Sequence, residues 1–375
     1  MPEISVMHVV LEPRYSGAEI LVRELARHQM QSGHRVSIAA LRPVQQSFAV
    51  EMQKLEQQGC RMSIPKAALN GMRRATWLYR SVKAIAPDIV FAHSALPSVY
   101  TRMALRLMRK PVVVTVLHSD DDFNDPRMRR MERLLWSRHA RVIGVNRKSV
   151  ENYRLRVTER VPTQVVLNGV DADRFASLAA DSHEWRQKLY APEPGEVIAV
   201  QVGRICTQKQ QHISVEALIR LKAQGISNLR LVIAGPIDEQ AYFNKLMTRI
   251  REGKVARQVQ VMGARGDIAE LLAGADMFLM PSDGEAHSIA ALEALASGAY
   301  CVFSGIPAFE GFQDLPGVFM LGDPPTAQEM AACLTNALAR GLWQRRYVRN
   351  LGNLTFERCA DEYNRLMRQL LHLSI

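Results

Sequence analysis

The sequence lacks the features that mark several classes of protein. Its five cysteines, among 375 residues, are widely spaced and form no CxxC pair, which argues against a disulfide framework and a zinc site. No apolar run approaches the roughly 20 residues that a transmembrane helix needs, so we expect no membrane span. The N-terminus carries no basic segment followed by a long apolar stretch. We therefore expect no secretory signal and a cytoplasmic protein.

Aromatic residues make up only 6% of the chain, and nucleic acid is not an expected partner. No basic motif is interleaved with aromatic residues as in RNA-binding modules, and no helix-turn-helix signal is present. The sequence also contains neither G-x-G-x-x-G nor a Walker loop. The absence of both counts against a dinucleotide or ATP as ligand.

The excess of positive over negative charge is confined to one half of the chain. Residues 1–175 contain 28 Lys and Arg against 16 Asp and Glu, whereas residues 176–375 contain 20 against 21. Met72, Trp77 and Leu78 are interleaved with the first basic cluster, as in an interfacial helix, so we expect an anionic membrane surface as partner. A solvated basic face is the simpler alternative. The clustered cations are Arg73, Arg74, Arg80 and Lys83, then Arg102, Arg106, Arg109 and Lys110, then Arg127, Arg129, Arg130, Arg133, Arg138 and Arg141.

Short apolar runs alternate with amphipathic stretches along nearly the whole chain. This order predicts an α/β fold with parallel sheets and crossover helices. It forms two blocks, 1–175 and 190–350, and the irregular stretch 171–194 between them, with Pro192 and Pro194, is expected to act as a hinge. An amphipathic helix is predicted from residue 356 onward. The predicted strands are 4–11, 35–41, 88–93, 111–118, 141–145, 164–167, 197–202, 229–234, 259–262, 277–280, 300–304 and 318–321.

In open parallel sheets ligands bind beyond the carboxyl ends of the strands, so residues that follow strands are the candidates. Ser16 and Gly17 lie in the turn after the first strand, where a ligand could approach a helix N-terminus; an ordinary turn is equally plausible. His93 and His118 both end predicted strands. The triplet 120–122 is acidic, but no second ligand cluster accompanies it, so a solvated loop is preferred and no metal site is expected.

The second half places cations and carboxylates after its strands. Gly203 and Arg204 follow one strand and Lys209 begins the next helix; two cations so close would suit a diphosphate, although a solvated pair is the alternative. Glu285 follows the strand 277–280, and Glu293 lies on the next helix. Two carboxylates in this arrangement can bind hydroxyls at two parts of a polyol, and the backbone at 286–288 can bind an anion.

These motifs together resemble the retaining glycosyltransferases of family 4, which have the GT-B fold, and the resemblance runs almost end to end. Glu285 and Glu293 match the family's E-x7-E element, and the stretch from Gly203 to Lys209 matches its G-R-x4-K element. The segments 168–175 and 273–282 match its N-G-V-D-x3-F and A-x-A-D…P-S elements. The chain departs from the pattern where many relatives have glycine, at Ser16, Gln210 and Ala286.

The resemblance implies two Rossmann-like domains facing across a cleft. The first, 1–175, would bind the acceptor, with the C-terminal helix 356–375 crossing back onto it, and the second, 190–350, would bind the donor. Transfer would need no metal or cofactor and no protein base, because a donor phosphate oxygen can take the acceptor proton. The resemblance places Arg204 and Lys209 at the diphosphate, Glu293 at the ribose, and Glu285 at the sugar with the backbone around His287, Ser288 and Ile289. It also implicates Gly203 in donor binding, Gly17 near the donor phosphates or the acceptor, His118 near the sugar, and Ser16 and His93 at the acceptor or in the cleft.

We therefore expect a bacterial-type hexosyltransferase that moves a hexose from a nucleotide diphosphate sugar, UDP favoured, to a glycan or lipid-linked glycan with retention of configuration. Its place would be cell-surface polysaccharide or lipopolysaccharide synthesis, peripherally on the cytoplasmic face of the inner membrane. Two alternatives stay open: a nucleotide-sugar epimerase of the same architecture and an inactive scaffold. An epimerase needs acid and base side chains, for which only His93, His118 and the triplet 120–122 are candidates.

Overall fold

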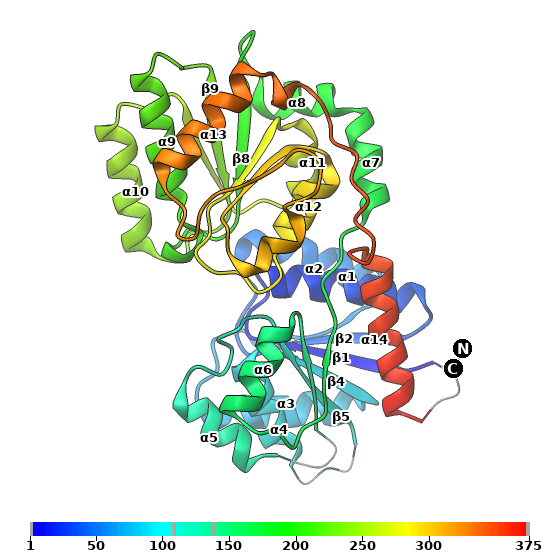
Figure 1. The fold of residues 1–375 in the computed structure, drawn as a ribbon. Helices are drawn as coiled ribbons and strands as arrows, with labels where there is room; N and C mark the ends of the chain where they lie inside the picture. The colour runs from blue at the N-terminus through cyan, green and yellow to red at the C-terminus, as the bar shows by residue number, and fades with distance from the viewer. Residues whose placement is uncertain (1–2, 107, 109, 137–139, 373–375) are drawn as a thin grey trace. The chain divides into compact units, whose positions relative to one another are not determined.

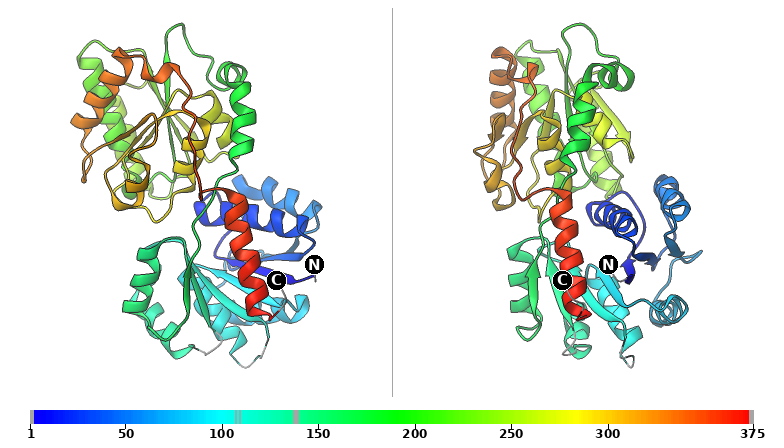
Figure 2. Two further views of the ribbon diagram at one scale, coloured as in Figure 1. Left: turned by 45° about the vertical axis from the view of Figure 1, so that its right-hand side comes forward. Right: turned by 90° about the vertical axis from the view of Figure 1, so that its right-hand side faces the viewer.

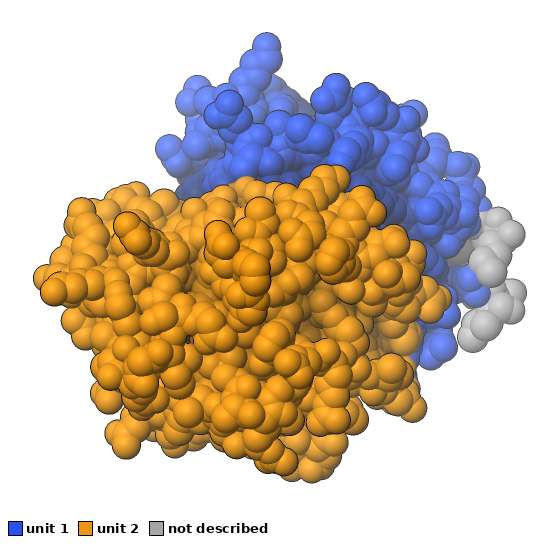
Figure 3. Space-filling model, turned by 90° about the horizontal axis from the view of Figure 1, so that it is seen from above, with its two compact units in different colours: residues 1–168, 357–375 blue, residues 169–356 orange. Residues whose placement is uncertain are grey.

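The chain folds into two compact units, each described by itself. The structure, a computed structural model, describes residues 3–106, 108, 110–136 and 140–372. Unit 1 comprises residues 1–168 and 357–375, and unit 2 comprises residues 169–356 (Figure 3). The boundary thus lies before the predicted end of the first domain at 175, and the second unit begins before the predicted 190.

Unit 1 is built on a seven-stranded parallel sheet with the order β3-β2-β1-β4-β5-β6-β7 (Figure 1). The winding direction reverses between β1 and β4, which makes the carboxyl ends of these strands a topological switch point. The short strand β3 was not predicted. The strands are β1 (Ser5–Val10), β2 (Arg35–Ala40), β3 (Arg61–Ser63), β4 (Ile89–His93), β5 (Val112–Leu117), β6 (Arg141–Gly144) and β7 (Thr163–Val165).

Helices cover both faces of this sheet because the strands alternate between two apolar surfaces. Met7 and Val9 of β1 pack with Leu78 and Val82 of α3, whereas Val10 packs with helices α1 and α2 on the other face. The helices of unit 1 are α1 (Gly17–Gln31), α2 (Ala49–Gln57), α3 (Met72–Ile85), α4 (Ala95–Leu105), α5 (Pro126–Leu134), α6 (Arg147–Arg156) and α14 (Phe356–Leu370).

The C-terminal helix α14 belongs to unit 1, as predicted, although residues 169–356, which lead into it, belong to unit 2. The side chains of Tyr363 and Met367 are buried, and the Tyr363 ring meets Phe91 of β4 edge-on at 5.3 Å between centroids. Figure 2 shows the helix lying along this unit in two views. Burial of its apolar stripe anchors the chain end to the sheet.

Unit 2 contains a six-stranded parallel sheet with the order β10-β9-β8-β11-β12-β13. Its switch point lies between β8 and β11. Together the two sheets confirm the predicted pair of Rossmann-like domains. The strands are β8 (Val197–Val202), β9 (Leu229–Ala234), β10 (Val259–Gly263), β11 (Met277–Met280), β12 (Tyr300–Phe303) and β13 (Val318–Met320). The helices are α7 (Ala172–Ala180), α8 (Ser182–Tyr190), α9 (Gln211–Ala223), α10 (Gln240–Glu252), α11 (Ile268–Gly274), α12 (Ile289–Ser297) and α13 (Ala327–Ala339).

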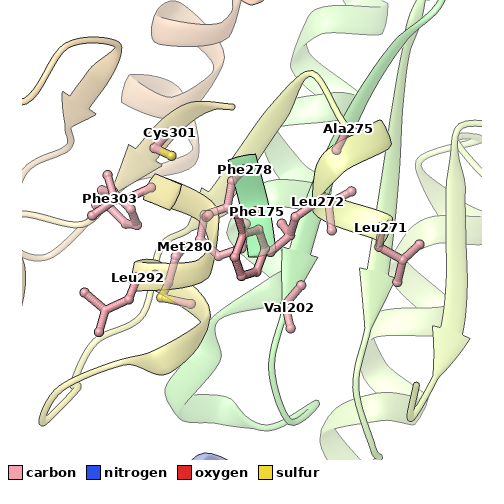
Figure 4. Packing of buried hydrophobic residues seen from close by; sticks show 14 of the residues in the cluster. Phe175, Val202, Leu271, Leu272, Ala275, Phe278, Met280, Leu292, Cys301 and Phe303 are labelled. Carbon is pink, nitrogen blue, oxygen red and sulfur yellow. The ribbon is translucent and has the colours of Figure 1, made fainter. Parts of the chain in front are cut away.

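Alternate strand residues of unit 2 enter two separate cores. On one face Val202, Phe278 and Phe303 pack with Leu272 of α11 and Leu292 of α12 (Figure 4). The intervening strand residues pack on the other face with α9, α10 and α13. Because both faces are covered, the strands are apolar almost throughout, as parallel strands must be.

The predicted hinge at 171–194 is wrong for most of its length. Residues 172–190 form the helices α7 and α8, and Phe175 and Tyr190 are buried in the core of unit 2. The Tyr190 hydroxyl also donates a hydrogen bond of 2.6 Å to the Leu271 carbonyl. Pro192 and Pro194 fall only after the second helix has ended, so they interrupt neither helix.

Two glycines allow β8 and β9 to approach closely at their carboxyl ends. Gly203 and Gly235 have φ angles of 151° and 156°, and the Gly203 amide donates to the Ala234 carbonyl at 2.9 Å. A Cβ atom on Gly235 would lie 1.9 Å from the Gly203 carbonyl oxygen. Gly235 is therefore required for the position of Gly203, from which the loop after β8 begins.

Gly235→Ala should lower the free energy of unfolding of unit 2 by roughly 2 kcal/mol more than Gly225→Ala does. Its Tm should therefore be about 4 to 8 °C below that of Gly225→Ala. Gly225 is the matched control, because its φ is also positive, at 82°, but no atom of the described residues lies within 4 Å of its Cβ position. The control isolates the cost of backbone strain from that of the clash. Equal Tm values for the two variants, measured by calorimetry, would contradict the prediction.

Candidate functional site

The loop after β8 brings Gly203, Arg204 and Lys209 together. Lys209 ends a short 3-10 helix at Thr207–Lys209, and its side chain passes 3.3 Å from where a Cβ atom of Gly203 would be. Gln201 fixes this turn by donating a 2.8 Å hydrogen bond to the Lys209 carbonyl. A side chain at 203 would press against the Lys209 stem, so the glycine leaves room for this cation beside the turn.

A second loop, after β11, is joined to the first. Lys209 Nζ forms an ion pair with Glu285, and the two side chains are only 13% and 9% exposed. Gln208 reinforces the contact. Its side-chain amide donates to the Gly284 carbonyl at 2.7 Å, and its backbone carbonyl accepts from the Asp283 backbone amide at 3.0 Å. The structure thus brings together two of the predicted residues, which are far apart in the sequence.

Arg204 has a partner that the sequence analysis missed. Its guanidinium pairs with Asp238, which follows β9, and both side chains are partly exposed. Its backbone carbonyl accepts a 2.9 Å hydrogen bond from Gln211 at the start of α9. Nothing in the spacing of Asp238 marks it in the sequence, because only the β8–β9 pairing makes it a neighbour of Arg204.

The remaining predicted residues of unit 2 lie at and beyond the N-terminus of α12. Ser288 is the N-cap, and its hydroxyl accepts a 3.4 Å hydrogen bond from the Ala291 amide. The next residue, Ile289, begins the helix, so the positive end of the helix dipole lies here. Burial lowers the pKa of His287 to about 4, so this ring is neutral at pH 7. Glu293 follows one turn later and is half-buried.

In unit 1, Ser16 and Gly17 are placed at the N-terminus of α1, with Ser16 as its N-cap. No atom lies within 4 Å of the Cβ position of Gly17 among the described residues, so this turn is open. The Ser16 hydroxyl bonds instead to Glu19, a residue not predicted. Burial raises the pKa of Glu19 to about 7.

His93 and His118 are direct neighbours in unit 1. His93 Nδ1 lies 2.8 Å from His118 Nε2, and the two rings stack at 5.1 Å between centroids. The other nitrogen of His93 bonds to His8 of β1, a residue that the sequence analysis missed. His8 stands inside a strand, where a single histidine gives no functional signal, and only the register between β1 and β4 reveals it.

The acidic triplet 120–122 is divided among separate partners. Asp120 accepts from Asn146 at 3.0 Å and Asp121 pairs with Arg156 at 3.1 Å. Asp122 accepts from the amides of His118 and Ser119, and burial raises its pKa to about 6. Within residues 3–106, 108, 110–136 and 140–372, no cluster of three or more His, Cys, Asp or Glu side chains could hold a metal ion. The triplet instead fixes the loop after β5.

Comparisons with known proteins match both units. The family model described as Glycosyltransferase Family 4 matches residues 15–174, and the one described as Glycosyl transferases group 1 matches residues 181–346. The chain is 25% identical over 247 residues to the UDP-Gal:alpha-D-GlcNAc-diphosphoundecaprenol alpha-1,3-galactosyltransferase of Escherichia coli, which covers 64% of this chain and 63% of that protein. It is 27% identical over 186 residues to the lipopolysaccharide glucosyltransferase WaaG of E. coli K12, covering 49% and 48%. The alignments thus span less than two thirds of these relatives' lengths.

Solved structures match over nearly the whole chain. Anabaena HepE in complex with UDP and glucose has a TM-score of 0.77 at 18% identity, covering 98% of this chain and 100% of that chain. The WaaG crystal structure has a TM-score of 0.71 at 17% identity, covering 97% and 99%. At these identities the likeness shows the fold, which is the GT-B fold predicted from the sequence.

Lys209→Met should destabilise unit 2 by about 3 kcal/mol, because it leaves the Glu285 carboxylate buried without its cation. Adding Glu285→Gln should recover more than half of this loss, since the buried charge is then gone. The measurement is Tm by calorimetry for the single and double variants.

Lys54→Met is the matched control. Lys54 is 55% exposed, and its partner Glu51 keeps Arg23 and Arg27, so the loss should stay below about 1 kcal/mol. If the losses from Lys209→Met and Glu285→Gln simply added, the two side chains would not be coupled and the prediction would be wrong.

Proposed function

Since the chain belongs to glycosyltransferase family 4, we propose that it transfers a hexose from a nucleotide diphosphate sugar to a hydroxyl of a glycan or lipid-linked glycan. The observation that carries the proposal is the cluster of Arg204, Lys209 and Glu285 at the switch point of unit 2. UDP is the favoured carrier and GDP the second candidate. A relative named for UDP-Gal and a neighbour solved with UDP and glucose support this choice.

The ion pairs of the free protein indicate how a donor would be held. A diphosphate can replace the carboxylates of Asp238 and Glu285 as the partner of Arg204 and Lys209, because each cation gains a more highly charged anion. Glu285 would then be released to accept hydrogen bonds from the sugar, and Glu293 is proposed to bind the ribose. The backbone at Ser288 and Ile289, at the positive end of α12, suits a group with negative charge.

In the proposed reaction the bond from the anomeric carbon to the diphosphate breaks, and the acceptor oxygen bonds to that carbon from the same face. The acceptor proton passes to a phosphate oxygen of the donor, so no protein base is needed and configuration is retained. Arg204 and Lys209 stabilise the growing charge on the leaving diphosphate, the task that a divalent metal performs in other transferases. We therefore propose a reaction without a resident metal or cofactor.

The acceptor is proposed to be a growing cell-surface polysaccharide or lipopolysaccharide. Support comes from two relatives, one named for a diphosphoundecaprenol-linked sugar and one for lipopolysaccharide. Such acceptors are attached to lipid, which would require the enzyme to work beside a membrane on its cytoplasmic face.

A panel of nucleotide sugars should give a higher Tm with UDP-hexoses than with GDP-hexoses, because a ligand that binds only the folded state stabilises it. Glu293→Ala should weaken UDP binding by roughly 1.5 to 3 kcal/mol, or about 10- to 150-fold in Kd, through loss of charge-assisted hydrogen bonds. Calorimetric titration with UDP measures this loss.

Glu252→Ala is the control, since Glu252 is an exposed carboxylate at the end of α10 and should leave Kd unchanged. Unchanged affinity in Glu293→Ala would reject the ribose role. Incubation of the protein with a UDP-hexose alone separates the alternatives: slow release of free hexose supports a transferase, conversion to another UDP-sugar would show an epimerase, and no binding would leave an inactive scaffold.

For the membrane contact, the structure changes which residues of α3 can take part. Leu78 is fully buried, Trp77 packs against the core, and Arg74 donates to the Leu69 carbonyl at 2.7 Å, so none of them forms a free surface. The helix instead exposes one mixed face of cationic and larger apolar side chains. These are Met72, Arg73, Tyr79, Arg80 and Lys83, with Met72 66% and Tyr79 42% exposed.

Other predicted basic residues are also not available. Arg102 is buried in an ion pair with Glu132, and Arg109 and Arg138 lie outside the described residues. No helix within the described part of the chain has the length and apolar character needed to cross a bilayer. We propose that the exposed face of α3 makes a reversible contact with anionic lipid.

Reversing Arg73, Arg80 and Lys83 to Glu should lower co-sedimentation with anionic vesicles at least tenfold, because each cation near such a surface contributes about 1 kcal/mol. Binding of the unchanged protein should need anionic lipid and weaken with salt. The control reverses Lys245, Arg251 and Arg257, exposed cations of unit 2, which changes the net charge equally. Equal losses in the two variants would mean that total charge, and not this face, determines binding.

A further inference from the structure

Three histidines of unit 1 form a hydrogen-bonded row across one face of its sheet. His8 lies within β1, His93 ends β4, and His118 follows β5. The register pairs His8 with Phe91 and His93 with Val116, so each histidine stands two residues further toward the carboxyl edge than the one before. Because alternate residues of a strand share a face, the three rings lie on the same side of the sheet.

The row begins at a buried amide and ends at the surface. Gln29 Oε1 of α1 lies 2.9 Å from His8 Nε2, His8 Nδ1 lies 3.0 Å from His93 Nε2, and His93 Nδ1 lies 2.8 Å from His118 Nε2. Gln29, His8 and His93 are at most 2% exposed, whereas His118 is partly exposed. The row of histidines crosses the switch point between β1 and β4, and open α/β sheets bind ligands at such a point.

All three rings are neutral at pH 7. Burial lowers the pKa of His8 and of His118 to about 4. Burial and the two neighbouring rings hold the pKa of His93 well below 6.5. A neutral imidazole has one nitrogen that donates and one that accepts, so each ring can exist as either of two tautomers.

The hydrogen bonds between the rings make the tautomer of each histidine depend on that of its neighbour. The carbonyl oxygen of Gln29 can only accept, so His8 donates from Nε2 and its Nδ1 carries a lone pair. His93 must then donate from Nε2 to His8, and His118 must donate from Nε2 to His93. Any other tautomer would place two lone pairs or two hydrogens face to face in the core, where an unmade hydrogen bond costs most.

We propose that Gln29, His8 and His93 are positioning residues that fix His118 as the Nε2–H tautomer, so that its Nδ1 lone pair is offered to a ligand as a hydrogen-bond acceptor. An acceptor on a neutral ring suits a ligand hydroxyl, which can donate, and not a carboxylate, which only accepts.

The tautomers can be read directly by NMR on the full-length protein with 15N-labelled histidine and no ligand. Long-range 1H–15N correlation should show that His118 has a protonated Nε2 and an unprotonated Nδ1, with no change between pH 6 and pH 8. Histidine-to-phenylalanine variants at positions 8, 93 and 118 assign the signals. A protonated Nδ1 on His118 would mean that the Gln29 amide donates to His8, and would overturn the proposed direction.

The coupling itself is tested with Gln29→Met, which keeps the shape of the side chain and removes the acceptor. His118 should then show averaged 15N shifts from two tautomers, whereas the control His34→Gln, at a buried histidine outside the row, should leave them unchanged. Unchanged His118 shifts in Gln29→Met would overturn the coupling. Because the wild-type spectrum alone decides the direction, a variant that fails to fold does not remove the test.

Discussion

The ion pair between Lys209 and Glu285 joins the two loops from which the candidate site of unit 2 is built. Lys209 follows β8 and Glu285 follows β11, and both side chains are largely buried. Burying either charge alone would be costly, so the pair stabilises the position of each loop relative to the other. The glycines at 203 and 235 serve the same contact, since they let β8 and β9 end close enough for the lysine stem to lie along the first loop.

This contact exists because the sheet changes its winding direction. Strands β8 and β11 are far apart in the sequence but adjacent in the sheet, since β9 and β10 extend it on one side and β12 and β13 on the other. At such a point the loops diverge to opposite faces and leave room for a ligand between them. Unit 1 repeats the arrangement at β1 and β4, where His8 and His93 meet. Both candidate clusters thus follow from strand order and not from local sequence.

The sequence predicts the strands well where a core on both faces makes them apolar, as in 197–202 or 277–280. It misses β3 because Arg61 and Ser63 give that three-residue edge strand no apolar pattern. It predicts a hinge where Pro192 and Pro194 stand, because proline acts locally, whereas the anchors Phe175 and Tyr190 depend on packing with distant residues. In the site, motif residues can be predicted from the sequence. Their partners Asp238, His8 and Gln29 cannot, since each becomes a neighbour only through sheet register or helix packing.

The ion-pair cluster of unit 2 and the histidine row of unit 1 differ in the charge of their buried polar side chains, and the difference suits two kinds of ligand. Unit 2 keeps formal charges in pairs, Lys209 with Glu285 and Arg204 with Asp238, so cations are already in place for an anion. In unit 1 burial keeps His8, His93 and His118 neutral. In such a row the tautomer of one ring fixes the tautomer of the next, and no charge is brought to the surface. A site for an anion needs cations of the first kind, whereas a site for an uncharged hydroxyl needs a neutral acceptor of the second kind.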